Sequence, residues 1–244
     1  MNWVLSNLGT IWSDTLAHLV VALPPIVVSF VLSVPIGWLV VRLRRANSES
    51  AAVRGVSRGA GGVIITVSSL LYAIPSLPLF IALPSLIGTN IQDPINIVIA
   101  LTLYGLALMV RSTADALESV DASILDAASA IGYSPAQRFF RVELPLAGPV
   151  LLAGIRVVAV STISLTTVGA VLGVISLGSL FTDGIQRGIP EEILSGIVMV
   201  LILAFVIDAV LVGLARLILP WLHRTATPSG RKRAAAPRES TVAS

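Results

Sequence analysis

Long apolar runs, separated by short polar segments, make up most of this chain. Five of them carry few or no charged residues over a length that lets a helix cross a bilayer. A bilayer offers the backbone no hydrogen-bond partner, so isolated runs of this kind favour helices. The pattern predicts an all-α integral membrane protein with five spans at residues 24–41, 59–80, 95–112, 149–175 and 193–219.

Two terminal segments flank the predicted membrane domain, which occupies residues 20–222. Residues 1–19 contain two Trp and one Asp but no Lys or Arg, so they lack the basic start of a signal peptide and are predicted to be interfacial. Residues 223–244 are rich in Arg, Ala, Pro and Ser, and are predicted to be a disordered basic cytoplasmic tail.

The second span lies in an uncharged stretch, residues 59–88, that three prolines interrupt. The pattern predicts one crossing to about Ile74, followed by a broken or re-entrant piece. Irregular backbone at membrane depth is tolerated where protein covers it or where it lines a water-filled cavity. Tyr72, Pro75 and Ser76 are therefore candidates for the lining of a translocation path. The alternative is a kinked helix packed against its neighbours.

The one long polar segment between spans is residues 119–147. Asp121 is a candidate N-cap, and Gly132 stands where a residue of left-handed conformation would end a first helix. Ser134, followed by a proline and then by Gln three positions on, would begin a second helix. Pro145 is predicted to end that helix. The segment is thus predicted to be a compact helical hairpin.

The basic residues set the orientation, because Lys and Arg concentrate on the cytoplasmic side of a membrane protein. With the N-terminus outside, five crossings and the C-terminus inside, fifteen of the sixteen Lys and Arg residues are cytoplasmic and only Arg187 is outside. The outer linkers, residues 75–92 and 176–192, are too broken by Pro and Gly for further spans. The sequence leaves open whether they are re-entrant or interfacial.

The composition is typical of a membrane protein and argues against several classes of function. The chain is 55% hydrophobic and 12% charged, with a mean hydropathy of +0.94, whereas soluble domains carry about 25% charged residues. It has no Cys, and its two His, His18 and His223, are far apart, so no metal site, hydrolytic triad or cofactor is predicted. The basic residues lie at span ends, and therefore no nucleic acid partner is predicted.

Two charged residues, Arg156 and Asp208, fall inside predicted spans. An ionised group at this depth is unfavourable unless it is paired or solvated. The hypothesis is that the two side chains face each other across the helical bundle. The alternative is that Arg156 snorkels to the headgroups while Asp208 faces water.

The polar segment also carries a spaced motif. Its matching residues are Asp126, Ala127, Ala128, Gly132, Leu144 and Pro145. The spacing resembles the cytoplasmic loop of bacterial ABC importer permeases, where Glu-Ala-Ala is followed by Gly and then by Ile-x-Leu-Pro. Here Asp126 replaces the Glu and Val142 replaces the Ile. The resemblance implies a type I importer permease whose hairpin couples to a separate ATPase subunit. The alternative is an ordinary helical loop of a membrane protein.

A longer resemblance, over about residues 18–218, is to the osmoprotectant branch of these permeases. The residues that carry it are His18-Leu19, Pro35-Ile36-Gly37, Ile74-Pro75-Ser76-Leu77, Leu103-Tyr104, Val110-Arg111, Val120-Asp121, Val142 to Ala147 with Pro149, and Ala153-Gly154-Ile155-Arg156. The family's glycine-rich stretch, usually Gly-Ala-Gly-Gly-Leu-Gly, is here Gly173-Val-Ile-Ser-Leu-Gly178.

The resemblance implies import of glycine betaine, choline, carnitine or proline across the bacterial inner membrane. It implies three partners in the lipid bilayer or beside it: an ABC ATPase, a separate extracytoplasmic binding protein, and a second permease copy or paralogue. The chain itself is predicted not to be an enzyme, because its only lysine, Lys232, lies in the tail and not in a Walker A loop.

Three other functions remain at this point. A permease for methionine or another amino acid would share the loop and a similar number of spans. A membrane-embedded enzyme would need a cluster of ionisable groups within the membrane, and the spans supply only Arg156 and Asp208. A structural or assembly subunit would not need the fixed spacing of the polar segment.

Overall fold

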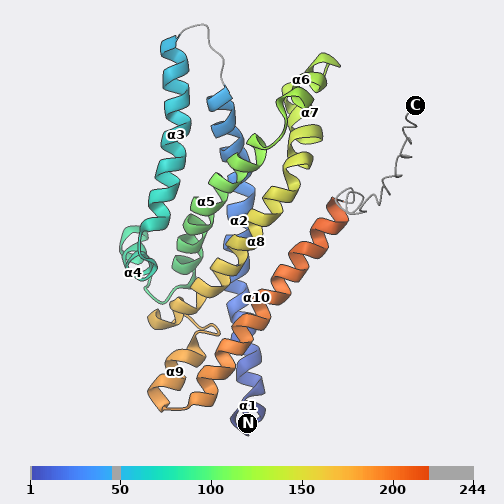
Figure 1. The fold of residues 1–244 in the computed structure, drawn as a ribbon. Coiled ribbons are helices and arrows are strands. Elements are labelled where there is room, and N and C mark those ends of the chain that lie inside the picture. Colours follow the sequence, from blue (N-terminus) through green and yellow to red (C-terminus); the bar gives the residue numbers. More distant parts are fainter. Residues whose placement is uncertain (1, 46–50, 220–244) are drawn as a thin grey trace, which may run out of the picture.

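The structure, a computed structural model, describes residues 2–45 and 51–219, and these form helices and connecting turns (Figure 1). The helices in chain order are α1 (Asn2–Ser6), α2 (Leu8–Arg45), α3 (Ala51–Ala73), α4 (Ser76–Ile87), α5 (Pro94–Glu118), α6 (Ala122–Ala130), α7 (Pro135–Arg138), the π-helical turn η1 (Phe139–Glu143), α8 (Leu144–Thr166), the 3₁₀ helix η2 (Thr167–Leu172), α9 (Ser179–Arg187) and α10 (Pro190–Ile218).

The predicted all-α membrane fold is confirmed. Within the described ranges, four helical segments are long and apolar enough to cross a membrane: Leu8–Arg45, Pro94–Glu118, Pro135–Leu172 and Pro190–Ile218. A fifth span forms only if α3 and α4, which meet at an angle of 102°, count as one bent crossing. The bend lies at Ile74 and Pro75, where the sequence predicted a break. Pro78 and Pro84 do not interrupt α4, which contains them.

Helix α2 begins earlier than the first predicted span. The chain is helical without a break across residue 19, and Pro24, Pro25 and Pro35 all lie inside α2. At 38 residues it is about 57 Å long, against a hydrocarbon core of about 30 Å, so it extends beyond the core. The interfacial placement of residues 1–19 stays a prediction. The predicted tail, residues 223–244, lies outside the described residues.

Helix α5 is at the centre of the bundle. It packs against α2, α3, α4 and α8, and its buried positions include Ile97, Leu101 and Met109. Small residues allow α2 and α5 to approach closely: a Cβ added at Gly105 would lie 2.6 Å from the Ser29 hydroxyl oxygen. Close packing through small residues is the usual way that membrane helices associate.

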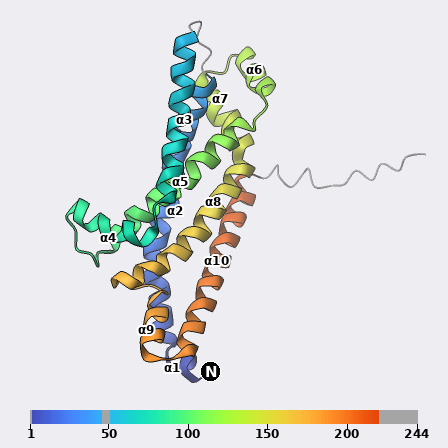
Figure 2. The ribbon, with the colours of Figure 1, turned by 60° about the vertical axis from the view of Figure 1, so that its left-hand side comes forward.

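Helix α10 lies at the edge of the bundle, on the side away from α3 and α4 (Figures 1 and 2). It packs on α8 and α9, and most of its apolar side chains are exposed, Leu201, Phe205 and Leu217 among them. Such a face is stable in lipid or against another apolar helix, but not in water.

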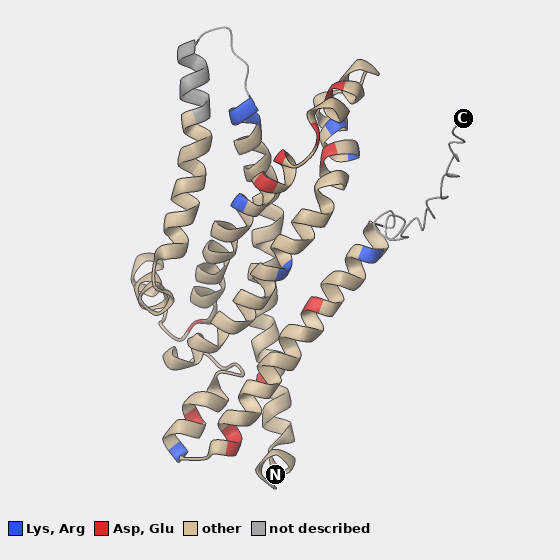
Figure 3. Ribbon diagram, in the orientation of Figure 1, with Lys and Arg blue, Asp and Glu red and all other residues tan. Residues whose placement is uncertain are grey.

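Most charged residues lie toward the two ends of the bundle, and a few lie partway along its helices (Figure 3). Arg42, Arg44 and Arg45 in the last turn of α2 share one end with the α6–α7 hairpin and with the C-terminal end of α10. The opposite end holds α1 and α9, and Arg187 is the basic residue in the last turn of α9. The fold therefore allows the predicted orientation, with the hairpin inside and α9 outside.

Cysteine accessibility measures that orientation directly, because the chain has no native Cys. Ile131, on the hairpin, and Gln186, on α9, are both exposed. In intact cells, Gln186→Cys is expected to react with a membrane-impermeant thiol reagent and Ile131→Cys to be protected until the membrane is permeabilised. Labelling of Ile131→Cys from outside would reverse the orientation.

Candidate functional site

The hairpin begins where the sequence predicted. Asp121 is the N-cap of α6, and its carboxylate accepts a hydrogen bond from the backbone N–H of Ser123 at 2.8 Å. This backbone hydrogen bond, together with one from the Ser123 side chain, lowers the pKa of Asp121 below its ordinary value. The cap therefore stays ionised near neutral pH and satisfies one of the free N–H groups at the helix start.

Gly132 ends the first helix in the predicted left-handed conformation, with φ at +92°. The N–H of Tyr133 donates to the carbonyl of Ala128 at 3.1 Å, and the N–H of Gly132 donates to the carbonyl of Ser129 at 3.0 Å. This pair of bonds is the Schellman motif, which requires a residue of positive φ at this position.

The second helix begins with the predicted capping box. The Ser134 hydroxyl accepts from the N–H of Gln137 at 3.3 Å, and the Gln137 side chain accepts from the N–H of Ser134 at 3.0 Å. Local hydrogen bonds thus fix the turn between the two short helices.

The prediction that Pro145 ends the second helix is wrong. The helix continues from Pro135 through η1 into α8, and Pro145 lies in the first turn of α8. A proline inside an α-helix clashes with the carbonyl four residues earlier. Here η1 widens the turn, with the Leu144 N–H bonded to the Phe139 carbonyl five residues back, so the proline fits.

The six motif residues lie on the hairpin and at its base. Asp126, Ala127 and Gly132 are exposed and Ala128 is buried, whereas Leu144 and Pro145 are half-buried at the start of α8. The hairpin also presents large apolar side chains that the sequence interpretation did not single out: Ile131 is 74% exposed and Phe140 is 65% exposed. Their signal in the sequence was an apolar residue within a polar segment.

The break between α3 and α4 is held by a tyrosine from α5. The Tyr104 hydroxyl donates to the Ile74 carbonyl at 2.5 Å, and its ring meets that of Tyr72 edge to face with centroids 6.0 Å apart. The Ile74 carbonyl lies at the bend, outside both helices, so Tyr104 supplies a donor that no helical N–H provides. Tyr72 and Pro75 are exposed beside the break, and Ser76 is half-buried.

The two charges predicted to pair are in contact in the structure. Arg156 on α8 donates from Nε and Nη2 to the two carboxylate oxygens of Asp208 on α10, at 2.5 and 2.8 Å. This parallel arrangement is the strongest geometry that an Arg and a carboxylate adopt. It joins α8 to the most exposed helix of the bundle.

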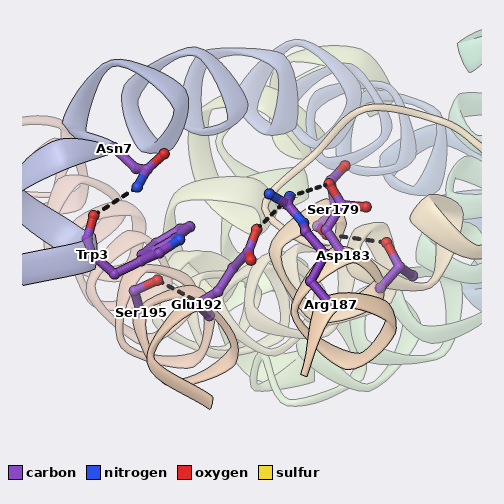
Figure 4. A network of polar contacts seen from close by, with 8 residues as sticks. Trp3, Asn7, Ser179, Asp183, Arg187, Glu192 and Ser195 are labelled. Atoms are coloured by element: carbon purple, nitrogen blue, oxygen red, sulfur yellow. Dashed lines mark hydrogen bonds and ion pairs between the residues drawn. The ribbon is translucent and has the colours of Figure 1, made fainter. Parts of the chain in front are cut away.

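A second polar network lies at the opposite end (Figure 4). Arg187, in α9, donates to Asp183 at 3.1 Å and to Glu192, in α10, at 2.9 Å. The Glu192 side chain is 1% exposed, and a carboxylate so buried requires a charged partner. Arg187, the one basic residue that the sequence placed outside, thus joins α9 to α10.

Among the described residues, no group of three His, Asp or Glu side chains lies close enough to hold a metal ion.

Comparison with known proteins gives a consistent result. Residues 50–224 match the family described as "Binding-protein-dependent transport system inner membrane component". The choline transport system permease protein OpuBB of Bacillus subtilis (strain 168) is 28% identical over 233 residues, which cover 96% of each chain. The osmoprotectant import permease protein OsmW of Salmonella typhimurium (strain LT2) is 32% identical over 211 residues, 85% of this chain and 91% of that protein.

The fold matches as well. A chain from the inward facing conformations of the MetNI methionine ABC transporter superimposes with a TM-score of 0.71 at 20% identity, covering 87% of this chain and 98% of that one. At that identity the match concerns the fold alone. The family match covers more than half of the sequence. The chain therefore belongs to the inner membrane components of binding-protein-dependent transport systems, the permeases of ABC importers.

Proposed function

We propose that this protein is the permease subunit of an ATP-driven importer of osmoprotectants such as glycine betaine, choline, carnitine and proline. The observation that carries the substrate class is the 32% identity to an osmoprotectant import permease over 85% of this chain. The 28% identity to a choline permease along nearly the whole of both chains supports it. The methionine transporter shares the fold at 20% identity, which gives no comparable argument for methionine.

The α6–α7 hairpin is the proposed contact with a separate ATPase subunit. The Schellman motif and the capping box fix the turn between its two helices. The hairpin exposes Ile131 in the turn between its helices, and Phe140 is exposed on η1, which follows α7 directly. Exposed apolar side chains in such a position are typical of a docking surface. Asp126, Ala127, Ala128, Gly132, Leu144 and Pro145 are proposed to shape that contact.

The break between α3 and α4 is the proposed lining of the translocation path. Tyr72, Pro75 and Ser76 lie there, and Tyr104 holds the freed backbone carbonyl of Ile74. A broken helix in a membrane is tolerated where protein or a water-filled cavity satisfies its free backbone groups. The hydrogen bond from Tyr104 satisfies one of these groups. Rocking of helical bundles around such a path is the general means by which transporters alternate access.

The remaining partners follow from the proposed importer. An extracytoplasmic binding protein would deliver the substrate at the end that holds α1 and α9. A second permease copy or a paralogue would complete the path, and the exposed apolar face of α10 is open to lipid or to such a neighbour.

Uptake of labelled glycine betaine tests the proposal. The permease is expressed with the ATPase and the binding protein encoded beside it, in a strain that lacks other osmoprotectant systems. Saturable uptake that unlabelled betaine or choline competes, and that is lost with a hydrolysis-deficient ATPase, is the expected result. Competition by methionine but not by betaine would instead identify an amino-acid importer.

A further inference from the structure

The C-terminal end of α2 is fixed to the base of the hairpin by one side chain. Arg45 forms an ion pair with Glu143 of η1, with Nη1 and Oε1 3.2 Å apart. Its Nη2 donates to the carbonyl of Leu117, in the last turn of α5, at 3.0 Å. A single guanidinium therefore joins α2, the end of α5 and the turn that leads into α8.

The burial of Glu143 makes loss of its partner unfavourable. The Glu143 side chain is 5% exposed, whereas that of Arg45 is 37% exposed. A carboxylate so buried is destabilising unless a charged donor meets it. Carbonyls in the last turn of a helix lack their usual partners, and a positive charge there is favourable. Lysine presents a single point of charge and would not reproduce a planar group that serves two acceptors at once.

Aromatic packing reinforces the same junction. Trp38 of α2 meets Phe139 of η1 edge to face with ring centroids 5.7 Å apart, and the Arg42 guanidinium lies 5.2 Å from the Trp38 ring. Phe139 is buried. The side chains of α2 thus contact η1 by an ion pair and by an aromatic pair.

The junction lies where the hairpin would otherwise bend. Covalently, the hairpin is attached only through the end of α5 and through η1, and η1 is a π-helical turn, a geometry frequent at functional sites. Helix α2 is not adjacent in sequence to the end of α5 or to η1. At this end of the bundle, a push on the hairpin reaches α2 through Arg45 and the Trp38–Phe139 pair, in addition to the packing of α2 along α5.

We propose that Arg45 is a positioning residue for energy coupling: through Glu143 and the Leu117 carbonyl it makes α2 move together with α5 and α8 when the ATPase moves the hairpin. This rests on the proposed importer function. Without Arg45 the ATPase still docks on the hairpin and still hydrolyses ATP, but less of its motion reaches α2 and less substrate is transported for each ATP.

The test uses the assembled complex of permease, ATPase and binding protein in liposomes, with transport and ATP hydrolysis measured on the same sample. Arg45→Gln and Glu143→Gln are each expected to lower the ratio of substrate transported to ATP hydrolysed by about fivefold or more, with normal co-purification of the ATPase. Arg45→Lys is expected to fall between these and the native protein. This ratio would not change if the pair only stabilised the fold.

Arg44→Gln is the matched control. Arg44 is the neighbouring residue on α2 and pairs with Glu118 at the end of α5, at 3.0 Å, but both side chains are more than 30% exposed and neither belongs to η1. Its loss is expected to leave the transport-to-hydrolysis ratio within about twofold of the native value, since exposed pairs contribute little.

The double substitution Arg45→Gln/Glu143→Gln guards against a folding defect, because it leaves no unpaired buried charge. It is expected to assemble in normal amounts and to stay uncoupled. A normal transport-to-hydrolysis ratio in this double variant, or in the single variants that assemble, overturns the role of Arg45. Failure of the importer function itself is distinguishable, because the native complex would then show no ATP-dependent uptake at all.

Discussion

Gly132→Val is expected to leave the protein in the membrane at near-normal abundance while it lowers both substrate uptake and recovery of the ATPase by about tenfold. The backbone at this position has φ of +92°, and an L-residue there is strained by roughly 1 to 2 kcal/mol. That strain is too small to unfold a membrane bundle, but relieving it would break the Schellman hydrogen bonds and re-aim the second helix of the hairpin.

The effect of Gly132→Val could arise from backbone strain or from a steric clash with a partner, and the space around Gly132 helps to distinguish the two. Among the described residues other than its chain neighbours, no atom lies within 4 Å of an added Cβ, so a clash with a partner is the second cause to test. Gly132→Ala carries the same backbone strain with less bulk and is expected to be milder. Equal and strong defects in the two variants would point to backbone strain as the main cause.

Gly88 supplies a matched control. It also has a positive φ, at +79°, and among the described residues nothing lies within 4 Å of a Cβ added there, but it follows α4 and not a helix of the hairpin. Gly88→Val is expected to keep ATPase recovery normal. The hairpin would not be the coupling element if Gly132→Val, too, retained normal uptake and normal ATPase recovery.

The features that sequence predicted best are those closed by local hydrogen bonds. Asp121 caps its helix from two residues away, and Ser134 and Gln137 cap each other across three residues. The helix ends at Gly132, whose N–H donates to a carbonyl three residues back, while the N–H of Tyr133 donates to a carbonyl five residues back. In each case the residue types at a short, fixed spacing determine the geometry, so the pattern is sufficient.

The features that sequence did not predict depend on residues far apart in the chain. Nothing near Glu143 indicates that Arg45, 98 positions earlier, is its partner. The donation from Tyr104 to the Ile74 carbonyl spans 30 positions. The error at Pro145 has the same origin: a proline ends a helix unless a widened turn precedes it, and η1 forms where the buried Phe139 and Glu143 contact α2.

Arg156 and Asp208 are an exception, since they are 52 positions apart and were still expected to meet. Few charges occur in the spans, and a charge in an apolar helix needs a partner or water. That scarcity made the pairing predictable, although not its parallel two-bond geometry. Because each charge depends on the other, folding is expected to be sensitive to substitution of either residue.

Asp208→Asn and Arg156→Gln are each expected to reduce the amount of folded protein and its uptake by about tenfold, because each leaves one charge unpaired on an apolar membrane-spanning helix. The double variant removes both charges and is expected to be less impaired than the product of the two single effects. Abundance in the membrane and uptake per molecule are measured for all three variants. Arg216→Gln, on the same helix as Asp208 but exposed near its end, is the control and is expected to behave like the native protein.

The double variant also distinguishes what the pair does. If the ion pair only holds α10 against α8, removing both charges should restore abundance and uptake together. If the pair has to separate or re-form as the bundle rocks, abundance should recover while uptake per molecule stays low. Strictly multiplicative effects of the two substitutions would mean that the charges act independently, with Arg156 reaching the headgroups and Asp208 facing water. The bidentate contact between α8 and α10 favours the coupled outcome, because each side chain supplies both hydrogen-bond partners of the other.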